Sequence, residues 1–416
     1  MRLKLLLLVL FFQATVAFGQ EDKFPSARPL GFVLPDYYTK ATIPFEIYNN
    51  LIVIDVLLNR SLPLKFILDT GVRTTVLTEK TLSDLLNLEY SRKITIPGVG
   101  GEKLVDAFVV NDVSLNIGEI QGDGHALLVL ETDLLQLKNF LGVNVHGILG
   151  YELFSRFIVD INYERKIINF YRPGDFKEKK KFTALDITVE DTKPYLMANF
   201  AIRDEEGVKK GKFMIDTGAS HTVLLDTRSE EFIECPDPNL KTTLGRGLGG
   251  TIHGHIARID ELYFDKFEFD GVITTFPDKD SYEVDFEASQ RNGTFGGGMM
   301  SRFHTIYNYA DGKIYIKKNS QYKKPFEFNL SGVIVKATGV YLREYEIDNI
   351  RENSSADEAG LKVGDEIIYI NGIDTERLTL DELIGKLNDR ENKRIRLVVM
   401  RDGKAVHINF RLHRLI

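Results

Sequence analysis

Two Asp-Thr-Gly triplets are the residues best suited to chemistry in this sequence. The first, Asp69-Thr70-Gly71, follows the apolar run Phe66–Leu68, and the second, Asp216-Thr217-Gly218, follows Phe213–Ile215. An apolar strand buries the base of such a loop, and the glycine permits a tight turn that presents the Asp carboxylate at a defined point. A single triplet indicates only an Asp-initiated turn. Two equivalent copies, in lobes related by a pseudo-twofold axis, can bring their carboxylates together.

The chemistry of such a pair follows from its charge. Two carboxylates about 3 Å apart cannot both ionise, so the pair holds one proton at intermediate pH. The ionised carboxylate can take a proton from water while the protonated one polarises a peptide carbonyl. The triplets therefore predict general acid–base hydrolysis by Asp69 and Asp216 without a covalent intermediate, a cofactor or a metal. His253 and His255 are of a residue type that binds metals, but no third ligand stands at a convincing spacing from them.

The triplets belong to an internal repeat. The Gly-rich segment Gly98–Gly101 returns as Gly247–Gly250, and Ile148–Gly150 returns as Phe295-Gly296. These landmarks occur in the same order and at nearly equal spacing in both halves, which predicts a duplicated domain. The second copy departs from the apolar-apolar-Gly pattern at its last landmark.

Each copy has the pattern of strands joined by turns. The run Leu51–Leu58 is apolar and β-branched, and 195–202 alternates in its own copy. Helical patterns are few, and Thr78–Leu88 is the main candidate. The charged, turn-rich stretch 173–182 indicates a solvated linker rather than a contact with an anionic surface.

Both copies, about 43–318, resemble the aspartic proteases. The resemblance implies that Asp69 and Asp216 each supply half of a catalytic dyad and that Thr70 and Thr217 cross-brace the two loops. It also implies a Gly-rich flap from each copy over the cleft. The first flap segment has no Tyr of the pepsin type, so the chain resembles a retropepsin dimer fused into one chain. The implied supporting and flap residues are Gly71, Gly218, Gly98, Gly100, Gly101, Gly247, Gly249 and Gly250.

The first motif departs from the family pattern. It continues with Val72-Arg73, whereas the second continues with Ala219-Ser220. Val72 offers no hydroxyl to the carboxylate, and Arg73 places a cation in the neighbourhood. This departure leaves open an alternative of another class, an exported peptide-binding scaffold whose lobes have lost catalysis.

The last ninety or so residues have a different character. Ala359–Gly372 has the string Ala-Gly-Leu-x-x-Gly-Asp-x-Ile-x-x-Ile-Asn-Gly, and Thr379 and Glu382 form a capping box. Arg396–Lys404 has the pattern of a hairpin with an Asp-Gly turn. This order resembles a PDZ domain of the kind appended to bacterial envelope proteases. The resemblance implies that an extended peptide adds as a strand. Its terminal carboxylate would be captured near Gly339, Val340, Tyr341 and Leu342.

The amino terminus has the layout of a secretory signal peptide. Arg2 and Lys4 precede the apolar run Leu5–Phe12, and Ala17-Phe18-Gly19 gives small residues before a cut at Gln20. No later segment is long and apolar enough to span a membrane. We therefore expect an exported protein, periplasmic or secreted, from a bacterium, with no membrane span in the mature chain.

Composition excludes some classes of function. The formal net charge of −7 offers no basic surplus for a nucleic-acid backbone, and the one cysteine, Cys235, allows no intramolecular disulfide framework. The expected partners are a peptide or protein substrate and a C-terminal peptide ligand of the PDZ domain.

The expected fold is mostly β, with two retropepsin-like β-barrel lobes in tandem and an α+β PDZ domain. The expected divisions are a signal peptide at 1–19, an N-terminal segment at 20–42, lobes at 43–172 and 183–318, linkers at 173–182 and 319–325, and the PDZ domain at 326–416.

Overall fold

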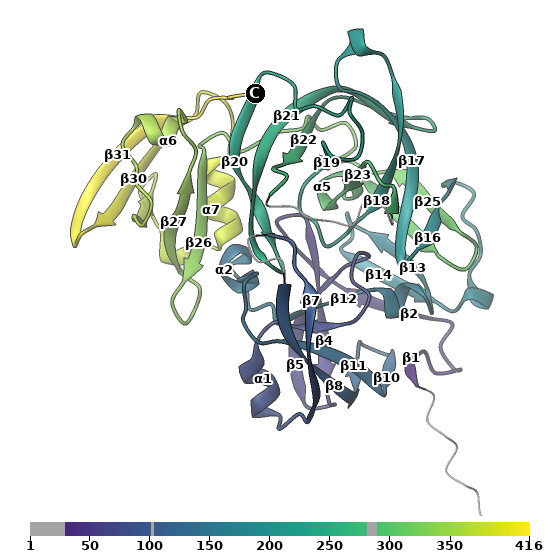
Figure 1. Cartoon of the computed structure of the whole chain (residues 1–416). Helices are drawn as coiled ribbons and strands as arrows, with labels where there is room; N and C mark the ends of the chain where they lie inside the picture. The colour runs from purple at the N-terminus through teal and green to yellow at the C-terminus, as the bar shows by residue number, and fades with distance from the viewer. Residues whose placement is uncertain (1–29, 101–103, 281–288) are drawn as a thin grey trace, which may run out of the picture.

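The computed structural model describes residues 30–100, 104–280 and 289–416, which form two lobes and a third, smaller unit (Figure 1). Strands dominate all three, as the sequence predicts. The predicted signal peptide and its cleavage point lie outside the described residues. Within the part of the chain that is described, no helix has the length and apolarity needed to cross a membrane.

The first lobe is built on a nine-stranded sheet. Eight strands follow the order β3-β4-β5-β12-β6-β11-β8-β7, and β9 pairs with β4. The apolar run that predicts a strand is β4, whose side chains are buried except near Asp55. The strands are β3 (Glu46–Tyr48), β4 (Leu51–Leu58), β5 (Leu62–Leu68), β6 (Val76–Leu77), β7 (Tyr90–Pro97), β8 (Leu104–Val113), β9 (Leu115–Asn116), β11 (His125–Leu130) and β12 (Gly147–Leu149).

The second lobe repeats this arrangement. Its sheet has the order β16-β17-β18-β23-β19-β22-β21-β20, so each strand has a counterpart in the first lobe. This confirms the duplicated fold that the sequence landmarks predict. The strands are β16 (Thr188–Glu190), β17 (Lys193–Ala201), β18 (Lys209–Ile215), β19 (Val223–Leu225), β20 (Asn239–Gly247), β21 (Gly250–Phe264), β22 (Phe267–Pro277) and β23 (Gly293–Phe295).

A six-stranded sheet joins the two lobes. At its centre β13 of the first lobe pairs antiparallel with β24 of the second, with Val159 opposite Tyr307. One apolar core runs through both lobes, so they pair within a single chain. The strands, in order, are β15 (Thr183–Asp186), β25 (Lys313–Lys318), β24 (Phe303–Asn308), β13 (Ile158–Asn162), β14 (Ile167–Tyr171) and β2 (Lys40–Pro44). A separate pair consists of β1 (Gly31–Val33) and β10 (Gln121–Asp123).

The segment between the lobes makes a specific contact with this sheet. The buried Asp160 on β13 accepts from Lys179 Nζ at 2.5 Å and contacts His304 Nε2 at 2.5 Å. Burial alone would raise the pKa of Asp160, but the hydrogen bonds from His304 and Lys179 bring it below its ordinary value. One lysine of the predicted solvated linker therefore fastens the linker to both lobes.

The helices of the lobes are short. The predicted helix Thr78–Leu88 is present only as α1 (Lys80–Leu85), because the Thr78 N–H is taken by the His146 carbonyl and Asn87 turns to a positive φ of 51°. The others are α2 (Leu137–Leu141), α3 (Tyr151–Phe154) and α5 (Gly297–Met300).

The C-terminal unit has its own core and sheet. Its strand order is β26-β27-β28-β30-β31, with β29 beside β28. Helix α7 (Leu380–Leu387) begins at the predicted capping box of Thr379 and Glu382, and the predicted Asp-Gly turn joins β30 to β31. The remaining elements are β26 (Val333–Thr338), β27 (Glu344–Ile350), α6 (Ser355–Glu358), β28 (Glu366–Ile370), β29 (Ile373–Asp374), β30 (Arg394–Arg401) and β31 (Lys404–Arg411).

Candidate active site

The two Asp-Thr-Gly loops leave the ends of equivalent strands, β5 and β18. The Asp69 N–H donates to the Leu149 carbonyl at 2.9 Å, and the Asp216 N–H donates to the Phe295 carbonyl at 2.9 Å. A Cβ at Gly150 would lie only 1.6 Å from the Asp69 carbonyl oxygen, so this position needs glycine. In the second copy a Cβ at Gly296 would instead lie 2.2 Å from the His221 carbonyl oxygen, and Phe295 stacks on Phe213 with ring centroids 4.4 Å apart.

The two threonines brace the loops across the lobe interface. Thr70 Oγ1 donates to the Ile215 carbonyl at 2.7 Å and accepts from the Thr217 N–H at 3.1 Å. Thr217 Oγ1 mirrors this, donating to the Leu68 carbonyl at 2.8 Å and accepting from the Thr70 N–H at 3.1 Å. Both side chains are fully buried. The cross-brace holds each Asp against the opposite lobe.

Replacing Thr217 with Val should destabilise the paired lobes by about 3 kcal/mol. The change keeps the shape but leaves the Leu68 carbonyl and the Thr70 N–H buried without partners, at about 1–3 kcal/mol each. Thr188→Val is a matched control, because its hydroxyl bonds only the exposed Glu190. Thermal unfolding followed by circular dichroism measures both variants, and equal melting temperatures would contradict the brace.

The two carboxylates meet at the centre of the interface. Asp69 lies against the opposite loop, since a Cβ at Gly218 of the second triplet would come within 2.3 Å of Asp69 Oδ2. The Gly71 N–H donates to Asp69 Oδ1 at 2.6 Å, and the Gly218 N–H donates to Asp216 Oδ1 at 2.9 Å. A Cβ at Gly71 would lie 3.0 Å from Asp69 Oδ1 and 3.3 Å from both Asp216 oxygens. The loop glycines therefore leave just enough room for the pair.

The environment of the pair favours one retained proton. Loss of surrounding water raises the pKa of Asp69 well above its ordinary value, and the charge and hydrogen bond of Asp216 raise it further. The Gly71 and Val72 N–H groups act in the opposite direction. Asp69 and Asp216 nevertheless stay partly exposed, so a substrate can reach them. A close, accessible pair of this kind can perform the acid–base chemistry predicted from the triplets.

The side chains of Val72 and Arg73 have partners other than the two carboxylates. Val72 packs in an apolar cluster that includes Leu248. The Arg73 guanidinium lies 3.0 Å from Asp191 in the turn before β17, and its side chain is 65% exposed. In the other lobe, Asn50 in the equivalent turn donates to the Ser220 carbonyl at 2.9 Å. Arg73 therefore belongs to a contact between lobes that occurs on both sides of the pseudo-twofold axis.

The two flap hairpins, β7–β8 and β20–β21, meet at their tips (Figure 1). The Gly249 N–H donates to the Val99 carbonyl at 2.8 Å. A Cβ at Gly247 would lie 2.3 Å from that carbonyl oxygen, and one at Gly100 would lie 2.4 Å from the Gly250 carbonyl oxygen. The structure thus brings together Gly100, Gly247, Gly249 and Gly250. Gly98 directly follows β7, and Gly101 lies outside the described residues.

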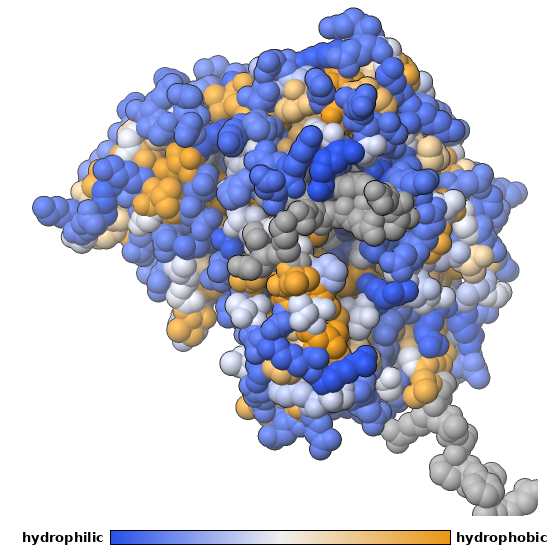
Figure 2. All heavy atoms as spheres, in the orientation of Figure 1, coloured by the Kyte–Doolittle hydropathy of each residue, from blue (hydrophilic) through white to orange (hydrophobic). Residues whose placement is uncertain are grey.

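An apolar cluster connects the dyad loop of the first lobe to both flaps. The cluster containing Val72 and Leu248 also includes Ile96 on β7 and Leu134. Figure 2 shows an apolar area in the middle of this face, over β7 and the elements beside it. This surface suits apolar substrate side chains.

Sequence reasoning missed the contacts of Asn50 and Asp191. The available signal was a pair of Asx residues at equivalent places in the repeat, just before β4 and β17. Both turns contain positive-φ residues, which Asn and Asp tolerate. His221 lies three residues after Gly218, and burial lowers its pKa to about 4 despite the charge of Asp216. It is therefore neutral beside the pair.

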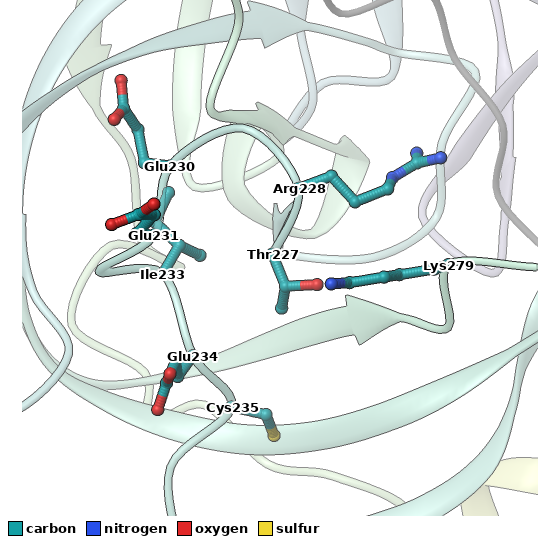
Figure 3. A pocket seen from close by; sticks show the side chains of 8 residues that line it. All are labelled: Thr227, Arg228, Glu230, Glu231, Ile233, Glu234, Cys235 and Lys279. Carbon is teal, nitrogen blue, oxygen red and sulfur yellow. The ribbon is translucent and has the colours of Figure 1, made fainter.

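A separate open hollow of about 590 Å³ lies in the second lobe (Figure 3). It contains none of the dyad, brace or flap-tip residues. It is lined by Thr227, Arg228, Glu230, Glu231, Ile233, Glu234, Cys235 and Lys279. We assign it no part in the chemistry of the carboxylate pair.

Nowhere in residues 30–100, 104–280 and 289–416 do three His, Cys, Asp or Glu side chains group so as to hold a metal ion.

The residues predicted to capture a peptide carboxylate, Gly339–Leu342, form the turn between β26 and β27. Val340 and Tyr341 are 89% and 87% exposed, whereas Leu342 is buried in the core. The Leu342 N–H closes the turn by donating to the Gly339 carbonyl at 3.3 Å. β26 is an edge strand, because it pairs only with β27, and of the two ends of this sheet it is the one in contact with helix α7. Carboxylate capture at the turn stays a prediction, and the geometry favours the edge of β26 instead.

Comparison with known proteins agrees with the fold. Residues 54–153 and 201–296 match the family model described as aspartyl protease, and residues 346–401 match a PDZ domain. The chain therefore carries two retropepsin-like aspartyl protease domains followed by a PDZ domain.

Two relatives share shorter stretches. The chain is 25% identical over 219 residues to the human Rap guanine nucleotide exchange factor 6, covering 47% of this chain and 13% of that protein. It is 38% identical over 61 residues to the carboxyl-terminal-processing protease of Synechocystis sp., covering 15% of this chain and 14% of that protein. The chain thus spans less than a sixth of the length of either relative. The second match supports a PDZ domain of the kind found in envelope proteases.

Proposed function

We propose that the protein is an aspartic endopeptidase that hydrolyses peptide bonds at the Asp69/Asp216 dyad. The observation that carries this proposal is the close approach of the Asp69 and Asp216 carboxylates in a pair of lobes whose two flap tips meet. In the mechanism, one carboxylate takes a proton from water as the water attacks the peptide carbonyl. The other donates its proton to the carbonyl oxygen, which forms the tetrahedral intermediate, and a second transfer protonates the leaving amine.

The loops supply the positioning for this chemistry. The Gly71 and Gly218 N–H groups hold one oxygen of each carboxylate, leaving the remaining oxygens for water and substrate. The joined flap tips exclude bulk water, which strengthens the electrostatic interactions within the cleft. Because the pair titrates as a unit, the catalytic form is the one carrying a single proton, whichever Asp holds it.

The raised pKa of Asp69 predicts activity at weakly acidic pH. The shared proton is kept above the ordinary carboxyl range, so kcat/KM should follow a bell-shaped curve whose alkaline limb falls as pH rises through the raised pKa. A cation beside the pair would lower this pKa. His221 is neutral and Arg73 is exposed and paired with Asp191, so neither supplies one. A pH–rate profile on one cleaved peptide measures this. An optimum confined to strongly acidic pH would contradict it.

The same shift predicts the pH dependence of stability. Folded Asp69 binds its proton more tightly than the unfolded chain does, so the free energy of unfolding falls as pH rises from the ordinary value of 3.8 through the raised pKa. Asp69→Asn removes this pH-dependent loss of stability, because an amide does not titrate. Its melting temperature should therefore exceed that of the unsubstituted chain at pH 7, and the gain should shrink towards pH 3. A gain that grows at low pH would contradict the assignment.

The rival function, an inactive peptide-binding scaffold, depends on Val72-Arg73. Arg73 is engaged with Asp191, which removes the main physical reason to expect a silent first lobe. Digestion of a peptide library over several pH values separates the two functions, because a scaffold would bind peptides and release them uncut.

We further propose that the protein is exported and that its PDZ domain binds a peptide along the edge of β26. The export proposal rests on the tripartite pattern of residues 1–19. Fractionation of the source cell, followed by sequencing of the mature amino terminus, tests it. An intact terminus in the cytosolic fraction would contradict export.

A further inference from the structure

Helix α2 of the first lobe lies against the PDZ domain. Asn139 Nδ2 donates to the Ala337 carbonyl on β26 at 2.8 Å. The helix ends at Gly142, where a Cβ would lie 2.5 Å from Leu380 Cβ at the start of α7. Figure 1 shows α2 beside β26 and α7. The first lobe thus covers one end of the groove between the PDZ edge strand and its helix.

This contact uses a group that an added strand would need. Ala337 lies on the edge strand, and a peptide added there would donate a backbone N–H to carbonyls of this kind. The Asn139 amide supplies an equivalent donor from the same chain. A peptide running along the full length of β26 therefore has to displace Asn139.

The same helix also contacts the second flap. The Arg246 guanidinium on β20 stacks over the Phe140 ring at 4.7 Å, and its Nη1 lies 3.5 Å from the Leu134 carbonyl. Leu248, two residues further along, packs in the apolar cluster with Val72 of the dyad loop. Helix α2 thus connects the PDZ groove to the flap tip that covers the carboxylates.

We propose that α2 is the resident occupant of one end of the PDZ groove, and that an extended peptide binding along β26 displaces α2 and releases the second flap. The inference rests on the proposed peptide binding at β26 and goes beyond it by naming a competitor and a route to the active site. Because the coupling is reciprocal, a ligand that closes the flap weakens peptide binding at the PDZ groove by the same factor.

The test compares two glycine substitutions in the full chain carrying Asp216→Asn, so that no probe is cut. Gly142→Ala places a methyl group against Leu380 at a position with φ +65°, which pushes α2 from α7. Gly207→Ala is the matched control, because Gly207 has φ +72° with nothing within 4 Å. The probe is a fluorescein-labelled ten-residue peptide selected from a random library on the Gly142→Ala chain.

Fluorescence anisotropy should show the probe binding Gly142→Ala about tenfold more tightly than the parent, with Gly207→Ala equal to the parent. In the parent, probe binding should also speed hydrogen exchange in residues 137–142 and in β20. Asn139→Asp, which loses the amide donor, should change affinity in the same direction and serves as the second variant.

Equal affinities for the three chains, or binding without faster exchange in α2, would overturn the competition. Failure to select any binder would overturn the groove as a peptide site. These readouts use an inactive chain and remain informative if the unsubstituted protein proves not to cleave peptides. Failure of the proteolysis proposal and failure of this inference are therefore distinguishable.

Discussion

Asp216→Asn should lower kcat/KM by about 10³–10⁴-fold, and Asp69→Asn should do the same. Each change keeps the side-chain shape and the hydrogen bond from the loop glycine, but removes either the base or the shared proton. General acid–base catalysis contributes about 10²–10⁴-fold, and the pair also orients the attacking water. The two effects should not add in the double variant, because the carboxylates act as one unit.

The measurement is the initial rate with a fluorogenic peptide that the unsubstituted protein cleaves. Asp55→Asn is the matched control, since Asp55 lies in the same lobe with its side chain 77% exposed, outside the site. Its activity should stay within about twofold of the unsubstituted chain, as expected for an exposed ion pair. Full activity in Asp69→Asn with complete loss in Asp216→Asn would make the first lobe non-catalytic.

Gly218→Ala should reduce activity by on the order of 10²-fold through geometry alone. A Cβ there would lie 2.1 Å from Asp69 Cγ, which is impossible without moving one loop from the other. Because the threonine cross-brace resists that movement, strain should also lower the melting temperature. The variant retains every ionisable group, so it separates the spacing of the carboxylates from their presence.

Gly385→Ala provides the control for Gly218→Ala. Gly385 lies inside α7, and an added Cβ would meet nothing within 4 Å. This control should keep full activity and gain up to about 1 kcal/mol in stability, because alanine favours a helix. Normal kinetics in Gly218→Ala would show that the carboxylates tolerate a wider separation than the proposed mechanism allows.

The sequence predicted the parts of the fold that depend on the repeat or on residues close together in the chain. The triplets, the Gly-rich segments and the later glycines occupy equivalent places in two sheets of identical strand order. The capping box of Thr379 and Glu382 starts α7 as predicted, because a helix cap depends on residues only three positions apart. For the site, the triplets named the two carboxylates, and the resemblance to the aspartic proteases implied the threonine brace.

Contacts between distant segments could not be predicted in this way. The partner of Arg73 is Asp191 on the other lobe, and Lys179 bonds a carboxylate buried in the shared sheet. Neither partner is implied by spacing along the chain. The contact between α2 and the PDZ domain also could not be predicted, because no sequence pattern marks Asn139 or Gly142.

The predicted carboxylate-capture segment shows a different limit of sequence reasoning. A short Gly-containing apolar segment between two strands fits a binding loop and a hairpin turn equally well. The positive φ angles of Gly339 (75°) and Leu342 (53°) and the short loop between paired strands identify a turn. The strand pairing, together with the contact between β26 and α7, favours β26 over this turn as the peptide site.

The most direct test of the Asp69/Asp216 endopeptidase is mass spectrometry of a defined peptide mixture incubated with the purified protein from strongly acidic to neutral pH. We predict new internal cleavage products with the unsubstituted chain, most abundant at weakly acidic pH and insensitive to chelators. The same products should be absent with Asp216→Asn and with Asp69→Asn. Intact peptides at every pH, or identical products from the Asn variants, would contradict hydrolysis at this carboxylate pair.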